Sequence, residues 1–346
     1  MTSLVVQTSF LGDVILSTPL IAELARRGPV DVLTTPQGAA ILANNPEIRN
    51  AIPYDKRRAD KGLPGFARTV SRVRQAGLST TTGTGDFYTD AYMAQGSVRS
   101  ALLVTAARIP NRIGFDTSQG RSLYTKRVTY RAERHHAERL WWLSMEECAD
   151  QPEPQQVAPR LYPSDADRAA VDALLAQHSP NSSRRLVVLA PGSVWGTKRW
   201  PLYPELATRI APLADVVIVG GADDSAGGDA ILAQLPPGSG LNAAGRCGLL
   251  AAAELIRRGA VLVANDSAPQ HLASAMGTPT VTIFGPTVPE FGFGPLAPHS
   301  VAAGHRGLAC RPCHRHGPQR CPLGHWRCMR ELSAGEIFDH VATILG

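Results

Sequence analysis

A carboxylate that directly follows a glycine is the first feature of this sequence able to do chemistry. In TSFLGDVILSTP, residues 8–19, Asp13 follows Gly12 where a short apolar run gives way to a helical pattern. An Asp at a helix start can cap free backbone N–H groups, and it can also take a proton from a substrate hydroxyl. The local pattern favours the helix cap, with general-base chemistry as the alternative.

A second candidate site lies in ANDSAPQHLASAMG, residues 264–277. Asp266 and Ser267 follow a predicted strand and are good N-cap residues, and Gly277 is a typical helix end. The N–H groups and the positive dipole end of this helix would bind a phosphate or diphosphate well. Capping alone is the simpler interpretation of the two residues. For His271, ligand binding and a half-buried position are alternatives.

A basic loop follows another predicted strand, in APGSVWGTKRWP, residues 190–201. Lys198 lies there beside the hydroxyls of Ser193 and Thr197. A fixed lysine could stabilise the charge that develops on a leaving phosphate without a metal ion. A solvated basic loop is the alternative.

Two neighbouring acidic residues, Asp223 and Asp224, follow the strand predicted in VIVGGADDSAGG, residues 217–228. The segment lacks the G-x-G-x-x-G order of a dinucleotide-binding turn. Either carboxylate could accept hydrogen bonds from a ribose or cap the helix that follows.

Four of the six cysteines fall within CRPCHRHGPQRCPLGHWRC, residues 310–328. The first pair has the C-x2-C spacing of a zinc knuckle, and the second pair is spaced more widely. One hypothesis is therefore a structural zinc ion, and the other is a surface loop with reduced thiols. The many arginines nearby also leave a nucleic-acid-binding module open. The candidate ligands are Cys310, Cys313, Cys321 and Cys328.

Alternating strand and helix patterns predict an α/β protein with parallel sheets that position these residues. Near the start of the chain, strands are expected at 3–7 and 30–35 and helices at 13–27 and 36–45. Further on, strands are expected at 184–192, 215–221, 259–265 and 279–285, helices at about 200–212, 226–235, 249–258 and 268–276, and a final amphipathic helix within 333–345.

The length of 346 residues is about twice that of a typical domain. The Pro-rich segment 150–165 suits a linker, so we expect domains at 1–160 and 161–346, the second with the Cys-rich loop and the final helix. STTTGTG, residues 79–85, is expected to form a polar loop.

Composition and charge limit the class of protein. Hydrophobic residues make up 44% and charged residues 18%, which is typical of a globular protein. The net charge of +6 favours acidic partners without choosing among them. The first residues have no basic leader, and no stretch approaches ~18 apolar residues, so we expect a cytoplasmic protein.

Several of these motifs, taken in order, resemble glycosyltransferase family 9, the ADP-heptose:lipopolysaccharide heptosyltransferases. The sequence is most similar to the heptosyltransferase II branch, and the resemblance runs nearly end to end. The motifs are SFLGDVILSTPL, QGSVRSALL with RIGFD, PGSVWGTKRWP, NDSAPQHLASAMGTPTVTIFGPT and CPLGHWRCM.

The resemblance implies a GT-B fold, in which two Rossmann-like domains face a central cleft. The first domain would bind the acceptor, and the second would bind the nucleotide sugar. The implied reaction is an inverting heptosyl transfer from ADP-heptose to the phosphorylated inner core of lipopolysaccharide, without a catalytic metal or cofactor. The acceptor is lipid-anchored, which implies peripheral contact with the inner face of the cytoplasmic membrane.

The resemblance also implies roles for individual residues. Asp13 would be the general base, and Lys198 would contact the donor diphosphate. Asp266 would hold sugar hydroxyls, with phosphate at the backbone of Ser267 and Ala268, where the family usually has Gly in place of the Ala. Asp223 or Asp224 would bind the ribose. Further candidates are Ser193, Thr197 and His271 for the donor and Gly12, Arg99 and Arg112 for the acceptor.

Three alternatives stay open at this stage. The same fold could use a UDP- or GDP-linked sugar on a different glycan acceptor. A two-domain α/β protein could also epimerise a nucleotide sugar. Finally, the Cys-rich loop could bind nucleic acid.

Overall fold

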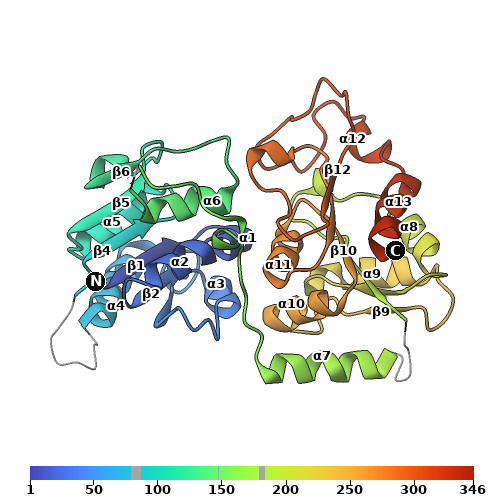
Figure 1. Ribbon diagram of the computed structural model, residues 1–346, viewed down its shortest axis with the longest axis horizontal. Coiled ribbons are helices and arrows are strands. Elements are labelled where there is room, and N and C mark those ends of the chain that lie inside the picture. The colour runs from blue at the N-terminus through green and yellow to red at the C-terminus, as the bar shows by residue number, and fades with distance from the viewer. Residues whose placement is uncertain (79–86, 147, 179–183) are drawn as a thin grey trace. The chain divides into compact units, whose positions relative to one another are not determined.

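The computed structural model describes residues 1–78, 87–146, 148–178 and 184–346, and it divides into two compact units (Figure 1). Unit 1 spans Met1–Tyr162 and unit 2 spans Pro163–Gly346, a division two residues beyond the expected one. The stretch 79–85, expected to form a loop, lies outside the described residues.

Unit 1 is built on a six-stranded parallel sheet in the order β3-β2-β1-β4-β5-β6. The central strands, at 3–7 and 30–34, are buried throughout because helices cover the sheet. The strands are β1 (Ser3–Gln7), β2 (Val30–Thr34), β3 (Asn50–Pro53), β4 (Asp90–Met93), β5 (Asn111–Phe115) and β6 (Lys126–Val128). The α-helices are α1 (Leu11–Leu16), α2 (Thr18–Ala25), α3 (Pro36–Ile41), α4 (Gly62–Leu78), α5 (Val98–Ala106) and α6 (His136–Trp141).

Unit 2 repeats this plan with the order β12-β11-β10-β7-β8-β9, again with parallel strands. Its strands are β7 (Leu186–Ala190), β8 (Asp215–Ile218), β9 (Gly240–Asn242), β10 (Val261–Asn265), β11 (Thr280–Ile283) and β12 (Val301–Ala303). Its helices are α7 (Asp165–His178), α8 (Tyr203–Ile210), α9 (Ser225–Leu232), α10 (Leu249–Arg258), α11 (Ala268–Met276), α12 (Arg327–Arg330) and α13 (Ala334–Leu345).

The single helix expected at 13–27 is in fact two helices that meet at Ser17. The side chains of Ser17 and Thr18 donate to the carbonyls of Val14 and Ile15, at 2.7 and 2.8 Å. These hydroxyls satisfy carbonyls that the break would otherwise leave open, and Pro19 then suits the first turn of α2. The break leaves α1 as a short helix that follows β1 directly.

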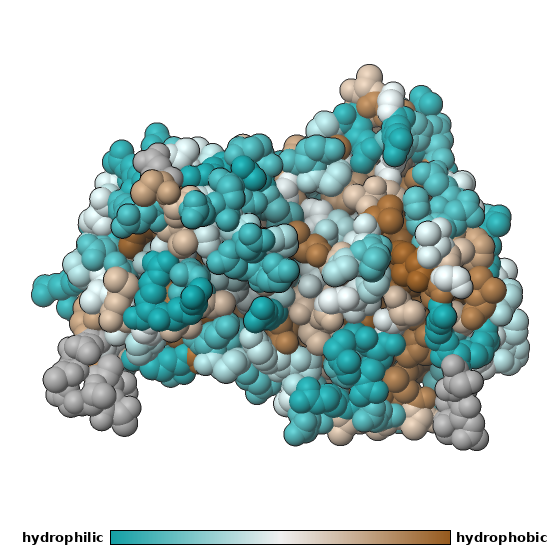
Figure 2. All heavy atoms as spheres, viewed as in Figure 1, coloured by the Kyte–Doolittle hydropathy of each residue, from teal (hydrophilic) through white to brown (hydrophobic). Residues whose placement is uncertain are grey.

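Each unit has its own apolar core. In unit 1, Leu4, Val6 and Met93 of the sheet pack with Leu103 and Val104 of α5. In unit 2, the final helix α13 packs beside α8, as Figure 1 shows, and buries Ile337 and Val341 in the core. On the face drawn in Figure 2, hydrophilic residues dominate and hydrophobic ones appear in scattered areas. No helix within the described residues is both long and apolar enough to cross a bilayer.

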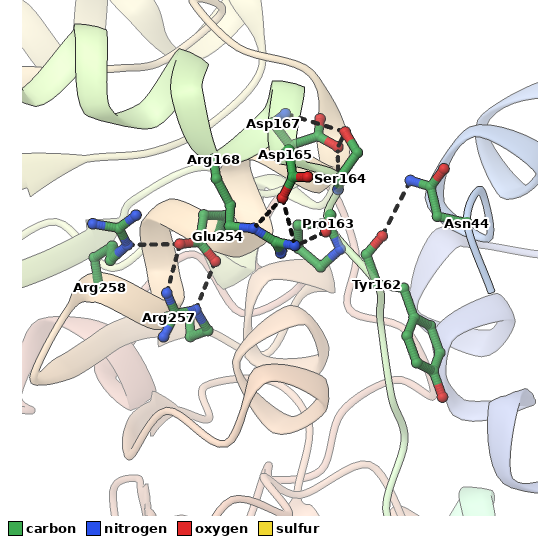
Figure 3. A network of polar contacts seen from close by, with 10 residues as sticks. All are labelled: Asn44, Tyr162, Pro163, Ser164, Asp165, Asp167, Arg168, Glu254, Arg257 and Arg258. Atoms are coloured by element: carbon green, nitrogen blue, oxygen red, sulfur yellow. Dashed lines mark hydrogen bonds and ion pairs between the residues drawn. The ribbon is translucent and has the colours of Figure 1, made fainter. Parts of the chain in front are cut away.

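Unit 2 begins with a capped helix, α7 (Figure 3). Ser164 and Asp167 cap the helix reciprocally: the Ser164 N–H donates to Asp167 Oδ2 at 2.8 Å and the Asp167 N–H donates to Ser164 Oγ at 3.2 Å. This is the arrangement that satisfies the first amides of a helix. On α10, Glu254 accepts hydrogen bonds from Arg257 and Arg258 in the same view.

Candidate functional site

The strand order locates one candidate ligand site in each unit. In both sheets the order reverses next to the first strand of the unit, between β1 and β4 and between β7 and β10. Open parallel sheets bind ligands at this switch point, outside the carboxyl ends of the strands. Asp13 follows β1, and the loop with Lys198 follows β7, so the sequence motifs lie at these edges.

In unit 2, an ion pair connects the two sides of the switch point. Lys198 Nζ lies 2.5 Å from Asp266 Oδ2 and 3.0 Å from the Asp266 carbonyl oxygen. Both side chains are about nine-tenths buried. Asn265, at the end of β10, also donates to the carbonyl of Pro191 at 2.9 Å. The loop after β7 is therefore fastened to the end of β10, with its lysine beside the start of α11.

The carboxylate of Asp266 is the centre of this site and not a helix cap. Its Oδ2 also accepts from Thr287 Oγ1 at 2.7 Å, and its Oδ1 accepts from Gln270 Nε2 at 2.9 Å. The N-cap residue of α11 is Ser267, whose side chain makes no capping hydrogen bond. The expectation that Asp266 and Ser267 cap this helix through their side chains is thus wrong, because Lys198 and its neighbours engage the carboxylate.

The start of α11 remains partly accessible. Ser267 and Ala268 are half-buried. Ala268 is the first residue of α11 and has no positive φ, so its backbone conformation does not require glycine. His271 is only 5% exposed, and its ring meets Phe293 edge to face at 6.4 Å between centroids. His271 thus lies inside the unit rather than on its surface.

Asp224 lies against two glycine-containing turns. Its Oδ2 accepts from the Gly221 N–H at 3.0 Å. A Cβ at Gly192 would stand 2.5 Å from this carboxylate, and a Cβ at Gly220 2.7 Å, so a side chain at either position would displace Asp224. The carboxylate therefore sits between the ends of β7 and β8. Asp223 is exposed and belongs to the same short 3-10 helix, Ala222–Asp224.

The Cys-rich segment supports the loop that carries Lys198. The Thr197 N–H donates to the Pro318 carbonyl at 3.3 Å, and Trp326 Nε1 donates to the Thr197 carbonyl at 2.9 Å. Within the loop, Ser193 Oγ accepts from the Trp195 N–H at 3.2 Å. Arg311 donates to the carbonyl of Gly285 at 2.7 Å. The contacts of Pro318 and Trp326 hold the Cys-rich segment against the loop that carries Lys198.

The structure does not support the predicted zinc site. Among the described residues, no three His, Cys, Asp or Glu side chains are arranged to hold a metal ion. Cys310 Sγ lies 4.0 Å from His325 Nε2, and Cys328 is buried on α12. Burial raises the pKa of the Cys328 thiol to about 11, and the nearby thiols of Cys313 and Cys321 raise it further. The C-x2-C spacing alone is thus insufficient evidence of a zinc site.

In unit 1, Asp13 pairs with a histidine that sequence analysis missed. Asp13 is the third residue of α1, whose N-cap is Phe10, so the helix-cap interpretation is wrong. His136 Nε2, at the start of α6, lies 3.6 Å from Asp13 Oδ1. Both side chains are less than a fifth exposed. The double histidine in RAERHHAERL was the one available signal for this pair.

The acceptor candidates differ in their surroundings. Gly12 is buried in α1. Arg99 donates to the Tyr54 hydroxyl and reaches the carbonyls of Asp60 and Gly62 at 3.5 and 3.4 Å. Arg112 donates to three carbonyls, among them Leu123 at 2.7 Å, and so braces the start of β5. Gln95 follows β4, and its side-chain amide donates to Thr8 Oγ1, after β1, at 2.6 Å. This hydrogen bond connects the two sides of the switch point between β1 and β4.

Two Rossmann-like units in one chain, each with a polar site at its switch point, define a glycosyltransferase fold of the GT-B class. The sequence profile of glycosyltransferase family 9 (heptosyltransferase) matches residues 84–325. Because this match covers more than half of the chain, the protein belongs to glycosyltransferase family 9 and is a glycosyltransferase.

Individual relatives agree with this assignment. The chain is 30% identical over 305 residues to lipopolysaccharide heptosyltransferase 2 of Salmonella typhimurium strain LT2, covering 83% of this chain and 84% of that protein. The structure of E. coli ADP-heptose lps heptosyltransferase II matches with a TM-score of 0.78 at 25% identity, over 100% of this chain and 98% of that one. A family 9 glycosyltransferase from Veillonella parvula DSM 2008 matches with a TM-score of 0.82 at 19% identity, over 99% and 97% of the two chains.

Proposed function

We propose that this enzyme transfers a heptose from ADP-L-glycero-β-D-manno-heptose to the inner core of lipopolysaccharide, with inversion and without a catalytic metal. The substrates are supported by the similarity to lipopolysaccharide heptosyltransferase 2 of Salmonella typhimurium and to E. coli ADP-heptose lps heptosyltransferase II. The observation that carries the proposal is the Lys198–Asp266 pair beside the start of α11, which lies at the switch point of unit 2.

The donor site would act on the leaving diphosphate. An ammonium group has three N–H donors, and Asp266 accepts two of them here, so one remains for a phosphate oxygen. The backbone at Ser267 and Ala268 would bind the other phosphate through the dipole of α11. Asp266 is fixed by Thr287 and would orient sugar hydroxyls. Asp224 or Asp223 would hold the ribose, and Ser193, Thr197 and His271 would shape the site.

Asp13 would be the general base. The acceptor hydroxyl gives its proton to the Asp13 carboxylate as its oxygen bonds to the anomeric carbon. The bond from that carbon to the diphosphate oxygen breaks on the opposite face, and ADP leaves with the electron pair. An Asp in the first turn of a helix is stabilised as an anion by the helix dipole, and it is therefore a weaker base. His136 would help to fix the orientation of the Asp13 carboxylate.

The acceptor site would use Arg99 for a phosphate on the inner core. Gly12 is buried in α1 and is given no direct contact with the acceptor. Arg112 was a candidate for the same role, but its guanidinium is engaged with three carbonyls, so this proposal assigns it to bracing. Because the acceptor is lipid-anchored, we place the reaction at the inner face of the cytoplasmic membrane.

Calorimetric titration with ADP, UDP and GDP tests the donor. We expect ADP to bind and the other two nucleotides to bind at least tenfold more weakly. Lys198→Met should weaken ADP binding by about 2 kcal/mol, because a charge-assisted hydrogen bond to phosphate is lost. Arg209→Met, which changes an exposed cation on α8, should leave ADP binding unchanged. Preference for UDP or GDP would instead support another nucleotide sugar and a different glycan acceptor.

A further inference from the structure

Unit 1 exposes an apolar surface on two neighbouring helices. Leu63, at the start of α4, is 83% exposed, and Val98 and Leu102, one turn apart on α5, are 43% and 47% exposed. The two helices pack against each other. We call Leu63, Val98 and Leu102 the apolar face.

Arg99 joins the starts of the two helices. From α5 its guanidinium reaches the Gly62 carbonyl at 3.4 Å and lies 5.7 Å from the centre of the Phe66 ring of α4. Leu63 follows Gly62 and Val98 precedes Arg99 in the chain. The exposed aliphatic side chains therefore belong to one continuous surface.

Cations outnumber carboxylates around this face. Neither α4 nor α5 contains an acidic residue, and α4 alone carries three arginines. The segment 56–61, which leads into α4, adds two lysines and two arginines. Its single carboxylate, Asp60, is buried and paired with Arg72 at 2.7 Å. Burial lowers the pKa of Lys56, and the neighbouring charge of Arg57 lowers it further.

We propose that the apolar face docks unit 1 on a membrane of anionic phospholipid. Exposed aliphatic side chains beside uncompensated Lys and Arg are the combination that lies in a bilayer interface. A nucleic acid would bind the cations through its phosphates but would leave the exposed leucines without an apolar partner. Three aliphatic side chains are also far short of the roughly 800 Å² that each partner buries in a stable dimer. The inference rests on the proposed function, since a lipid-anchored acceptor requires the enzyme at the membrane.

Flotation with phospholipid vesicles tests this surface. The full chain should float with vesicles of 3:1 phosphatidylethanolamine and phosphatidylglycerol at low salt, and about tenfold less with pure phosphatidylcholine. Leu63→Ser with Leu102→Ser should reduce binding to the anionic vesicles about tenfold, because burial of two leucines is lost. Arg57→Gln with Lys61→Gln should reduce it roughly 30-fold, with a weaker dependence on salt.

A matched variant gives the control. Leu213→Ser with Leu323→Ser removes two leucines of similar exposure from unit 2 and should bind vesicles like the unmodified enzyme. No binding to either vesicle, or undiminished binding by Leu63→Ser with Leu102→Ser, would overturn the proposal. Activity on a deacylated, water-soluble acceptor separates the two hypotheses. If the docking variant retains this activity, the transferase assignment stands whatever the vesicles show, and if the unmodified enzyme has none, that assignment fails by itself.

Discussion

At the scale of single residues, the identity of Asp13 matters less than what holds it. Its place after Gly12 suggested a helix cap, yet Phe10 occupies that position and the carboxylate meets His136 instead. A carboxylate paired across two helices has a defined orientation, which proton transfer requires. This contact turns an ordinary acidic residue into the best candidate for the base.

We expect Asp13→Asn to lower kcat by a factor of 10² to 10⁴, because the amide cannot take the proton. ADP affinity and the melting temperature should stay near those of the unmodified enzyme, since Asn keeps the size of the side chain. Steady-state kinetics with calorimetry and thermal melting would check this. Glu23→Gln, which changes a carboxylate on α2, is the control and should keep full activity. Full activity in Asp13→Asn would remove Asp13 from the mechanism.

At the scale of elements, loops and the first turns of helices carry the residues of the candidate sites. Ion pairs hold neighbouring helices of unit 2 together. Glu254 of α10 is nearly buried and accepts from Arg257 and Arg258 at 2.6 Å. Arg258 also reaches Asp172 of α7 at 3.1 Å. This cluster fastens the first helix of unit 2 to the helix beside α11.

Glu254 should make the stability of unit 2 depend on pH. Hydrogen bonds from Arg257 in particular lower the pKa of Glu254 to about 2. The contribution of Glu254 to the free energy of unfolding is therefore present above about pH 4.5 and is lost as the pH falls toward 2. We expect Glu254→Gln to cost about 2 kcal/mol in free energy of unfolding at pH 7, allowing for the partial exposure of the arginines. The difference from the unmodified protein should shrink as the pH falls below 4.5. Denaturant unfolding at several pH values measures it, and a difference constant with pH would contradict the assignment.

At the scale of the whole molecule, the chain consists of two units with separate cores and separate candidate sites. The proposed donor site lies entirely within unit 2, and the proposed base within unit 1. A ligand that binds only the folded form of one unit stabilises that unit by mass action.

Scanning calorimetry should therefore resolve two unfolding transitions, of which ADP shifts only one. At 100 times its dissociation constant, ADP should add about 2.7 kcal/mol to unit 2 and raise its melting temperature by roughly 5–10 °C. Lys198→Met should reduce this shift without moving the other transition. A shift of both transitions, or of neither, would contradict a donor site confined to residues 163–346.

The sequence alone carried the prediction of an α/β protein with strands and helices in the right order, because burial of parallel strands leaves continuous apolar runs and helix ends have their own residues. The family motifs also identified the class of enzyme. Breaks such as the one at Ser17 and short edge strands such as β6 and β12 escaped prediction, since too few residues define them.

Only the tertiary structure decided which side chains meet. The pairs Asp13 with His136, and Lys198 with Asp266, join residues far apart in the chain, and no local pattern encodes such contacts. At residues 310–328, where the spacing predicted a zinc site that the structure does not support, the segment instead contacts the loop that carries Lys198. Local sequence specifies backbone conformation through short-range sterics and burial. The position of a functional group depends on how the sheet order brings distant loops to one edge.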